Sequence, residues 1–371
     1  MSEALMVTSS FLPGRGGIES YLAELCSSLT PRLSVLAPPE RDGRKLPRDF
    51  AYPTHALPGH PAPGPRTLRA IAETATRENT DRILFGTPWP LVLLGPALAR
   101  RGLRYAVIVH GAELLVPAAI PGLRSYLARC LAGADLLLPV SDFTAERLHG
   151  LVAKPSQVRI ERLRARVDLD RFTPETDTSE VRRRLGIGPE SKMVLCFGRL
   201  VPRKGVDRVI EVLPAIIERV PGATVVVAGT GPEERSLRRL SERTPGRVIF
   251  AGRVPDDEAP AYYAAADVFA LPVEDRWFGL DVEGLGVVLL EAAACGTPCV
   301  TGRSGGTPEA VIHGVTGLVT DAGRPDDLVE ALVRILEDDD LAGAMGRAGR
   351  EHVARNFSAS IVPQPLIEWL A

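Results

Sequence analysis

Residues 192–228 read KMVLCFGRLVPRKGVDRVIEVLPAIIERVPGATVVVA, and this stretch decides the fold class. The apolar run Lys192–Phe197 predicts a buried strand, and the run Ala223–Ala228 predicts a second one. Between them, Gly205–Glu218 carries apolar residues at the spacing of an amphipathic helix. A strand, a helix and a strand in this order form a unit whose two strands lie parallel, with the helix packed on one face.

The same alternation extends through the rest of the chain. In the first half, strands are predicted at Ala4–Thr8, Leu33–Ala37, Arg82–Phe85, Tyr105–Val109 and Asp135–Val140, and helices at Ile18–Leu29, Pro65–Glu78, Leu91–Arg101, Leu123–Ala132 and Thr144–Gly150. The second half adds strands at Arg247–Phe250, Val268–Leu271, Cys299–Thr301 and Leu318–Val319, and helices at Glu233–Arg243, Glu258–Ala265, Val287–Ala294 and Pro325–Glu337. The alternation predicts an α/β fold with mostly parallel sheets covered on both faces by helices.

The chain divides where this alternation restarts. Charged and turn-forming residues gather between positions 164 and 189, and 371 residues suit two domains at about 150 residues each. We therefore expect an N-terminal domain over residues 1–168 and a C-terminal domain over residues 169–350. Residues 351–371 predict a helical tail interrupted by Pro363 and Pro365, and in two-lobed folds such a tail often crosses back to the first domain. Small-molecule sites are common between two such lobes.

Composition excludes several classes of protein. Hydrophobic residues make up 45% and charged residues 24%, which are values of a globular chain, not a disordered one. A net charge of −2 and only 5% aromatic residues argue against nucleic acid as a partner. The charge is nevertheless uneven. Residues 1–171 hold 22 basic and 16 acidic side chains, a net +6, which suits contact with an anionic membrane surface.

The sequence predicts neither a targeting segment nor a membrane-spanning segment. Residues 1–7 lead directly into a strand without the pattern of a signal peptide, and no apolar run reaches the roughly 20 residues that span a bilayer. The five cysteines are scattered, which predicts reduced, buried thiols and no metal site. We expect a cytoplasmic protein that contacts the inner face of the plasma membrane peripherally.

Two glycines follow the first predicted strand, in Pro13-Gly14-Arg15-Gly16-Gly17-Ile18-Glu19. Gly16 and Gly17 let a ligand approach the backbone, and the helix start behind them offers unpaired N–H groups to a phosphate. The spacing differs from the dinucleotide-binding fingerprint, so a plain tight turn explains this segment equally well.

Two cations follow the first strand of the second domain. Arg199 and Lys204 bracket a turn at the carboxyl end of a strand, where open α/β sheets bind ligands. Two positive charges there suit a pyrophosphate and stabilise it as a leaving group. The alternative is a solvated loop. Arg203 and Arg208 are predicted to be surface residues.

The most specific local pattern is Glu283-Gly-Leu-Gly-Val-Val-Leu-Leu-Glu291. Gly284 and Gly286 permit a close approach, and the amides around Gly286, Val287 and Val288 begin a helix. Glu291 lies one turn later in an apolar stretch, where an ionised carboxylate needs hydrogen bonds. Two sugar hydroxyl groups would supply those bonds.

A histidine closes another strand of the first domain. His110 precedes Gly111 after the run Tyr105–Val109, a position from which its ring can point into a cleft. A hydrogen-bonded structural histidine is the alternative. The segment Ser304–Glu309 is predicted to be a mainly structural glycine-rich turn. No Asp-x-Asp motif is flanked by apolar strand residues, so a divalent-metal nucleotide site is unsupported.

Taken together and in order, these segments resemble the family-4 retaining glycosyltransferases of the GT-B fold. Gly279-Leu-Asp-Val-Glu-Gly-Leu-Gly-Val-Val-Leu-Leu-Glu291, with Gly17–Leu22 and Arg199–Gly205, is most similar to the actinobacterial GDP-mannose-dependent phosphatidylinositol-mannoside mannosyltransferases. The resemblance implies two Rossmann-like domains that face each other across a donor cleft. It also implies hexosyl transfer, without a metal or other cofactor, from a nucleotide-sugar donor to a glycolipid.

The resemblance assigns a role to each motif. Arg199 and Lys204 would bind the diphosphate, and the amides of Gly16 and Gly17 would cap the distal phosphate. Glu283 would hold hydroxyls of the donor sugar, and Glu291 those of the ribose. His110 would contact the sugar and support positive charge at the anomeric carbon. The backbone near Arg253 and Val254 would read the base.

Three features depart from this family's pattern and concern the acceptor. Ala112 stands where a second histidine is usual, and Arg166 stands where a glycine is usual. The segment Pro272–Leu280 is also unusual, and its Trp277-Phe278 pair would shape an altered acceptor pocket. Three alternatives stay open beside this function: a glycosyltransferase that uses another UDP- or GDP-linked donor on a small-molecule acceptor, a nucleotide-sugar epimerase, and a nucleotide-sugar sensor without turnover.

Overall fold

The computed structural model describes residues 2–14, 16–41, 43–47, 49–152, 158–321 and 323–371, and the chain forms two compact units. Unit 1 comprises Met1–Ala165 with Val362–Ala371, and unit 2 comprises Arg166–Ile361. Arg15 of the glycine motif lies outside the described residues. None of the helices in the described ranges is long and apolar enough to span a bilayer.

The division between the units differs by three residues from the predicted boundary after residue 168. Val167 forms a bridge with Ser358, in which Val167 N–H donates to the Phe357 carbonyl at 2.7 Å and Ala359 N–H donates to the Val167 carbonyl at 2.8 Å. These hydrogen bonds join the segment to residues of unit 2 that lie far away in the sequence, so a local sequence pattern does not predict them.

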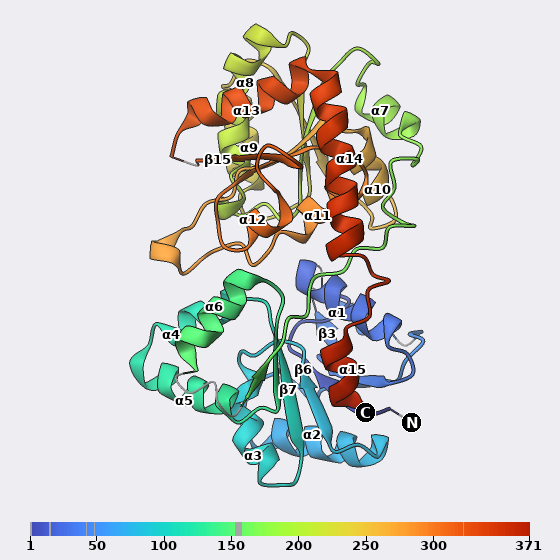
Figure 1. Cartoon of the computed structure of the whole chain (residues 1–371), viewed down its shortest axis with the longest axis vertical. Helices are drawn as coiled ribbons and strands as arrows, with labels where there is room; N and C mark the ends of the chain where they lie inside the picture. Colours follow the sequence, from blue (N-terminus) through green and yellow to red (C-terminus); the bar gives the residue numbers. More distant parts are fainter. Residues whose placement is uncertain (1, 15, 42, 48, 153–157, 322) are drawn as a thin grey trace. The chain divides into compact units, whose positions relative to one another are not determined.

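Unit 1 is built on a parallel seven-stranded sheet in the order β5-β2-β1-β6-β7-β8-β9 (Figure 1). Its strands are β1 (Ala4–Val7), β2 (Leu33–Ala37), β5 (Thr54–Ala56), β6 (Arg82–Phe85), β7 (Arg104–Val109), β8 (Leu136–Pro139) and β9 (Arg159–Ile160), and its helices are α1 (Gly17–Ser28), α2 (Pro65–Glu78), α3 (Gly95–Ala99), α4 (Ala112–Ala118), α5 (Pro121–Ala132), α6 (Asp142–Leu151) and α15 (Gln364–Leu370). A separate antiparallel pair joins β3 (Glu40–Arg41) to β4 (Arg44–Lys45).

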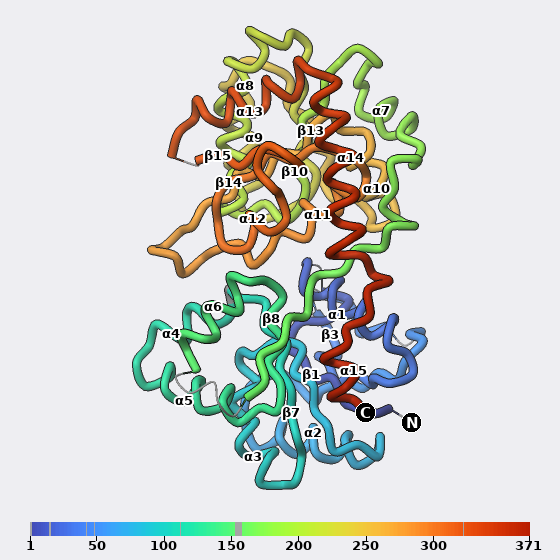
Figure 2. The backbone as a smooth tube through the Cα atoms, in the orientation of Figure 1, coloured from blue at the N-terminus to red at the C-terminus, as the bar shows by residue number. Residues whose placement is uncertain are grey.

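Unit 2 is built on a parallel six-stranded sheet in the order β12-β11-β10-β13-β14-β15. Its strands are β10 (Met193–Phe197), β11 (Thr224–Ala228), β12 (Arg247–Gly252), β13 (Val268–Leu271), β14 (Cys299–Gly302) and β15 (Gly317–Thr320), and its helices are α7 (Ser179–Leu185), α8 (Val206–Arg219), α9 (Glu234–Ser241), α10 (Ala259–Ala265), α11 (Val287–Ala294), α12 (Thr307–Ala310), α13 (Pro325–Glu337) and α14 (Asp339–Asn356). Helix α8 contacts α9 and α13, whereas α11 contacts α10 and α14 (Figures 1 and 2).

Each unit buries its own core. Strand β1 and most of β7 are fully buried in unit 1, and β11 is fully buried in unit 2. Strands covered on both faces read as continuous apolar runs, which is why the sequence reveals them. All five cysteines are buried free thiols, and burial raises the pKa of each, to about 11 for Cys130.

The structure corrects two predicted helices. Residues 91–101 form a short 3-10 turn, η1 (Leu91–Leu94), followed by α3, because Pro96 lacks the N–H that a continuous helix requires. The predicted tail 351–371 is not a single helix. Helix α14 ends at Asn356 in unit 2, and only Val362–Ala371, with α15, belongs to unit 1.

Candidate active site

Each sheet contains one point at which the strand order reverses. In unit 1 the reversal lies between β1 and β6, and in unit 2 it lies between β10 and β13. Open α/β sheets bind ligands beyond the carboxyl ends of their strands at such points. Gly16 and Gly17 follow β1, Lys204 follows β10, and Glu283 follows β13. The predicted residues therefore lie where each sheet favours a ligand.

Lys204 and Glu283 form a shielded ion pair in unit 2. Lys204 ends the 3-10 turn η2 (Pro202–Lys204), and its Nζ lies 2.8 Å from Glu283 Oε2. The two side chains are only 11% and 12% exposed. Burial raises the pKa of Glu283, but the positive charges of Lys204 and Arg203 outweigh it and hold that pKa below its usual value. Glu283 is therefore an ionised carboxylate.

Arg203 belongs to the same cluster, so the prediction that it is a surface residue is wrong. Its Nε lies 3.4 Å from Glu283 Oε2, and its Nη1 lies 3.2 Å from Asp281 Oδ1. Arg208, also predicted at the surface, is partly buried and pairs with Glu274. The sequence hides these pairs because the carboxylates follow the arginines by more than 60 positions.

A glycine-rich turn supports the backbone of Glu283. A Cβ on Gly305 would lie 1.9 Å from the Glu283 carbonyl oxygen, and one on Gly306 would lie 2.3 Å from that of Gly284. The Ser304 hydroxyl accepts a hydrogen bond from Glu283 N–H at 3.1 Å and donates to Asp275 at 2.6 Å. The segment Ser304–Glu309 is structural, as predicted, and it positions the backbone of Glu283 in the candidate site.

Helix α11 begins beside this cluster. Gly286 precedes it with a φ of +82°, a conformation that glycine adopts without strain. Val287 and Val288 form the first turn, so their N–H groups have no carbonyl within the helix. These amides point out of the helix start and can bind an anionic ligand.

Glu291 lies one turn into α11 and has a partner that the sequence did not indicate. The Tyr263 hydroxyl of α10 donates to Glu291 Oε2 at 2.7 Å. Burial raises the pKa of Glu291, and the hydrogen bond from Tyr263 and the charge of Arg171 partly oppose this shift. The Tyr263 hydroxyl therefore orients the Glu291 carboxylate, and Glu291 Oε1 is its second oxygen that can accept a hydrogen bond.

Three predicted residues lie at other strand ends of unit 2. Arg199 follows β10, is exposed, and has no ion pair with any described residue. Arg253 and Val254 follow β12, the first exposed and the second buried. They share the carboxyl edge of the sheet with Lys204 and Glu283, because the strands are parallel.

His110 lies at the end of β7 in unit 1 and is almost fully buried. Its Nε2 lies 3.0 Å from the Gly86 carbonyl, so Nε2 carries the proton, and the ring meets Tyr21 edge-on at 5.5 Å. Its backbone N–H donates to Glu113 at 2.6 Å. Burial lowers the pKa of His110, so the imidazole is neutral near pH 7 and Nδ1 is an acceptor.

Gly16 and Gly17 begin helix α1, as predicted. Gly16 has an extended backbone, and a Cβ placed on Gly17 would have no neighbouring atom within 4 Å. Glu19 of the first turn folds back over Gly16, where a Cβ would lie 2.6 Å from Glu19 Oε2, and Arg41 approaches Glu19 at 3.6 Å. An anion at this helix start would meet the Glu19 carboxylate as well as the amides.

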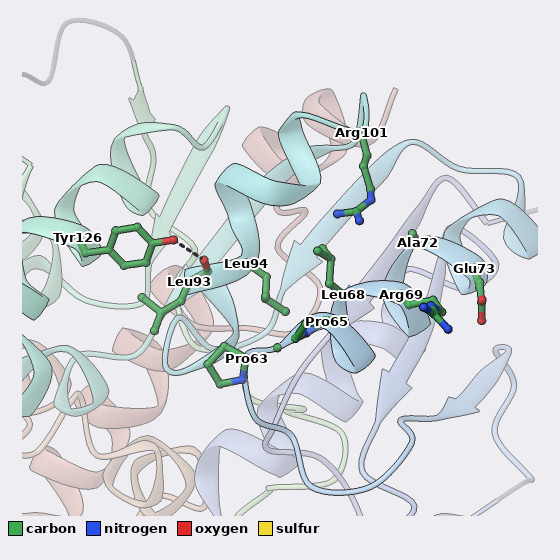
Figure 3. Close-up of a pocket in the computed structure, with 11 residues that line it drawn as sticks. Pro63, Pro65, Leu68, Arg69, Ala72, Glu73, Leu93, Leu94, Arg101 and Tyr126 are labelled. Atoms are coloured by element: carbon green, nitrogen blue, oxygen red, sulfur yellow. Dashed lines mark hydrogen bonds between the residues drawn. The ribbon is translucent and has the colours of Figure 1, made fainter.

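A separate concavity of about 740 Å³ opens in unit 1 between α2, η1 and α5 (Figure 3). Leu68, Leu93 and Leu94 line it, with Arg69 and Arg101 at its edges, and Tyr126 donates to the Leu93 carbonyl at 3.1 Å. It contains none of the predicted site residues. Within the described ranges, no group of three or more His, Cys, Asp or Glu side chains is placed to hold a metal ion.

Comparison with protein families matches both units. Residues 15–171 match Glycosyltransferase Family 4, and residues 177–352 match Glycosyl transferases group 1. The GDP-mannose-dependent alpha-(1-6)-phosphatidylinositol monomannoside mannosyltransferase of Mycobacterium tuberculosis is 39% identical, over 100% of this chain and 98% of that protein. The GDP-mannose-dependent monoacylated alpha-(1-6)-phosphatidylinositol monomannoside mannosyltransferase of Corynebacterium glutamicum is 36% identical, over 98% of this chain and 96% of that protein.

Solved structures agree on the fold. Anabaena Alr3699/HepE, solved with UDP and glucose, has a TM-score of 0.82 at 21% identity, over 100% of this chain and 99% of that one. WaaG, a glycosyltransferase of lipopolysaccharide biosynthesis, has a TM-score of 0.74 at 19% identity, over 99% of each chain. Together with the family matches and the full-length relatives, this fold shows that the chain belongs to the family-4 glycosyltransferases of the GT-B fold and is a glycosyltransferase.

Proposed function

We propose that this enzyme transfers a mannosyl residue from GDP-mannose to a hydroxyl group of a phosphatidylinositol mannoside, with retention of configuration. The supporting observation is identity of 36–40%, over at least 95% of the chain, to enzymes named for that donor and acceptor. The Lys204–Glu283 cluster supplies the charges that such a donor requires.

Unit 2 carries the groups that would bind the donor. Arg199 is exposed and unpaired among the described residues, so it is available to a diphosphate, and Lys204 would share its charge between Glu283 and the phosphate. The amides of Val287 and Val288 would add hydrogen bonds. Glu291 would accept from the ribose hydroxyls. The backbone at Arg253 and Val254 would contact the base.

The proposed reaction needs no protein nucleophile. The bond between the anomeric carbon and the diphosphate oxygen breaks, and its electron pair leaves with GDP. The acceptor oxygen forms the new bond on the same face of the sugar, and its proton passes to the leaving diphosphate. Arg199, Lys204 and the α11 amides stabilise the departing charge. Ionised Glu283 would hold sugar hydroxyls. Neutral His110 would accept a hydrogen bond from a sugar hydroxyl through Nδ1, and its lack of charge would not oppose the positive charge that develops at the anomeric carbon. The amides of Gly16 and Gly17 would cap the distal phosphate.

The direct test is transfer with purified components. Incubation with GDP-mannose and phosphatidylinositol mannoside should yield, by mass spectrometry, a product that carries one mannosyl residue more than the acceptor, with GDP released in equal amount. Stabilisation by GDP-mannose but not by UDP-glucose or UDP-N-acetylglucosamine should accompany it, because a ligand that binds only the folded state raises its melting temperature. Transfer from a UDP sugar alone contradicts the donor assignment. An epimerised sugar without acceptor, or no turnover with any acceptor, contradicts transfer itself.

We also propose that the reaction needs no metal ion, because Arg199, Lys204 and helix-start amides supply the positive potential at the diphosphate. Activity should persist in excess EDTA and should not rise when magnesium is restored. A loss of activity in EDTA that magnesium reverses would contradict this assignment.

Membrane contact forms a further part of the proposal. The net charge of +6 over residues 1–171 supports attraction to the anionic inner leaflet that would hold the acceptor. Binding to phosphatidylglycerol vesicles should be strong at low salt and weaken as added salt screens the charges. Binding that does not depend on salt or lipid charge would exclude this electrostatic contribution.

A further inference from the structure

A hairpin between β13 and α11 carries two aromatic side chains at its tip. Arg276 and Asp281 close it, with Arg276 N–H donating to the Asp281 carbonyl at 2.9 Å and the reverse bond at 3.2 Å. The turn η3 (Trp277–Gly279) forms the tip, where Trp277 is 70% and Phe278 107% exposed. Figures 1 and 2 show this hairpin, coloured orange, extending away from the sheet of unit 2.

The backbone at the tip is strained and its base is firmly held. Trp277 and Phe278 have φ values of +50° and +56°, a region that bulky L-residues rarely adopt. Below them, Asp275 accepts from the Ser304 hydroxyl at 2.6 Å, and Arg203 pairs with Asp281 at 3.2 Å. Strained conformations persist where the surrounding contacts impose them, and they are frequent at functional surfaces.

The hairpin presents an uncharged tip above a neutralised base. Residues 277–280 carry no charge. Each carboxylate beneath them has a partner. Glu274 pairs with Arg208 and with Arg276, the latter at 3.0 Å, Asp281 pairs with Arg203, and Asp275 accepts the Ser304 hydroxyl. The tip can therefore leave water without carrying an unpaired charge with it.

The apolar area of this tip is too small for a stable protein interface and suits a lipid bilayer. Two aromatic side chains bury about 150–250 Å² each, which is well below the roughly 800 Å² per partner of a stable protein interface. A bilayer interface needs no complementary pocket, and Trp, with an apolar ring and one N–H, favours the boundary between headgroups and acyl chains. We propose that Trp277 and Phe278 insert into the interface of a lipid bilayer, in a contact that does not depend on lipid charge.

Vesicle flotation tests this contact without donor or acceptor, so its result is independent of the proposed reaction. Uncharged phosphatidylcholine vesicles are used at about 1 M salt, where the Debye length is about 3 Å and electrostatic attraction is screened. The variant Trp277→Gly/Phe278→Gly should fold, because glycine adopts positive φ without strain. Its partition coefficient should fall at least about tenfold relative to wild type. The control Val315→Ala, at another exposed apolar side chain of unit 2, should bind as wild type does.

Fluorescence quenching locates the contact. Brominated phosphatidylcholine should quench part of the tryptophan emission of the wild type, and Trp277→Phe should abolish that part while Trp89 and Trp369 still emit. No wild-type binding to neutral vesicles, unchanged binding by the double variant, or an equal loss in Val315→Ala overturns the proposal. If the tip instead stacks on the acceptor sugar or meets a protein, the double variant should bind neutral vesicles as wild type does. A loss of binding by the double variant therefore argues against both of these roles for this contact.

Discussion

At the scale of single residues, Lys204 carries the sharpest expectation. It is shielded from water and paired with Glu283, so its removal leaves the carboxylate with Arg203 alone. In the proposed complex, its removal would also take away one of the two cations, Lys204 and Arg199, that bind the donor diphosphate. We expect Lys204→Ala to lower kcat/KM by about 10²–10³-fold, the effect of losing one charge-stabilising donor. Steady-state kinetics with saturating acceptor measures this change.

The matched control is Lys192→Ala. Lys192 is also in unit 2, but it directly precedes β10, at the opposite end of that strand from Lys204, and it pairs with Asp339 at 2.6 Å and Asp267 at 3.6 Å. We expect its kcat/KM to remain near that of wild type, with both variants retaining the wild-type circular dichroism spectrum. Near-normal transfer by Lys204→Ala would remove Lys204 from the donor site.

His110 makes a prediction about pH. Burial lowers its pKa in the folded state, so the unfolded chain binds a proton first as the pH falls. The stability that depends on neutral His110 is therefore complete above the unfolded pKa of about 6.5 and is lost as the pH falls below it. His110→Asn, which can still donate to the Gly86 carbonyl, should show a smaller fall in melting temperature between pH 7.5 and pH 5.5 (chosen from that pKa, about one unit to either side). Identical pH profiles would show that His110 does not titrate in this range.

At the scale of elements, the turn before α12 and the loop before α11 act as one support. Gly305→Ala would combine a positive φ with a Cβ 1.9 Å from the Glu283 carbonyl oxygen. Gly314→Ala has a similar positive φ of +78° but no atom within 4 Å of its Cβ, so it measures the conformational cost alone. We expect Gly314→Ala to lose about 1–2 kcal/mol of stability and Gly305→Ala to lose distinctly more.

Activity should separate the same two variants. Gly305→Ala displaces the backbone of Glu283, so kcat/KM should fall by at least about tenfold, and Gly314→Ala should leave it unchanged. Urea denaturation and kinetics on both proteins measure the two effects. Equal stability and equal activity in the two variants would show that the turn does not position Glu283.

At the scale of the whole molecule, the two units have separate cores, and the donor-binding groups of the proposal are concentrated in unit 2. GDP at 100 times its Kd would stabilise the state that binds it by about 2.7 kcal/mol. Hydrogen exchange should therefore slow in the peptides that contain Lys204, Glu283 and Glu291. The strand β11 is fully buried and contains none of these residues, so it serves as the internal reference. Slowing confined to unit 1 would contradict the assignment of the nucleotide to unit 2.

The α/β class and the central strands of both sheets were predictable from the sequence, because their signals are local, whereas the short edge strands β5 and β9 were missed. Fully buried strands appear in the sequence as apolar runs. Glycines directly before a helix mark the loop that joins the strand to that helix. The alternation predicted β10, α8 and β11 to within one residue. It missed the split at Pro96 and the extent of α14, where a helix-breaking residue and a weakly amphipathic stretch obscure the period.

The sequence by itself determined which segments are candidates for the site, since strand ends, glycine loops and charged residues can be read along the chain. Only the tertiary structure decided their partners. It paired Arg203 with Glu283 and Asp281, Tyr263 with Glu291, Gly305 with the Glu283 backbone and Val167 with Ser358. Such contacts join residues of different elements that lie far apart in the chain. They depend on strand order and packing, which no local period encodes.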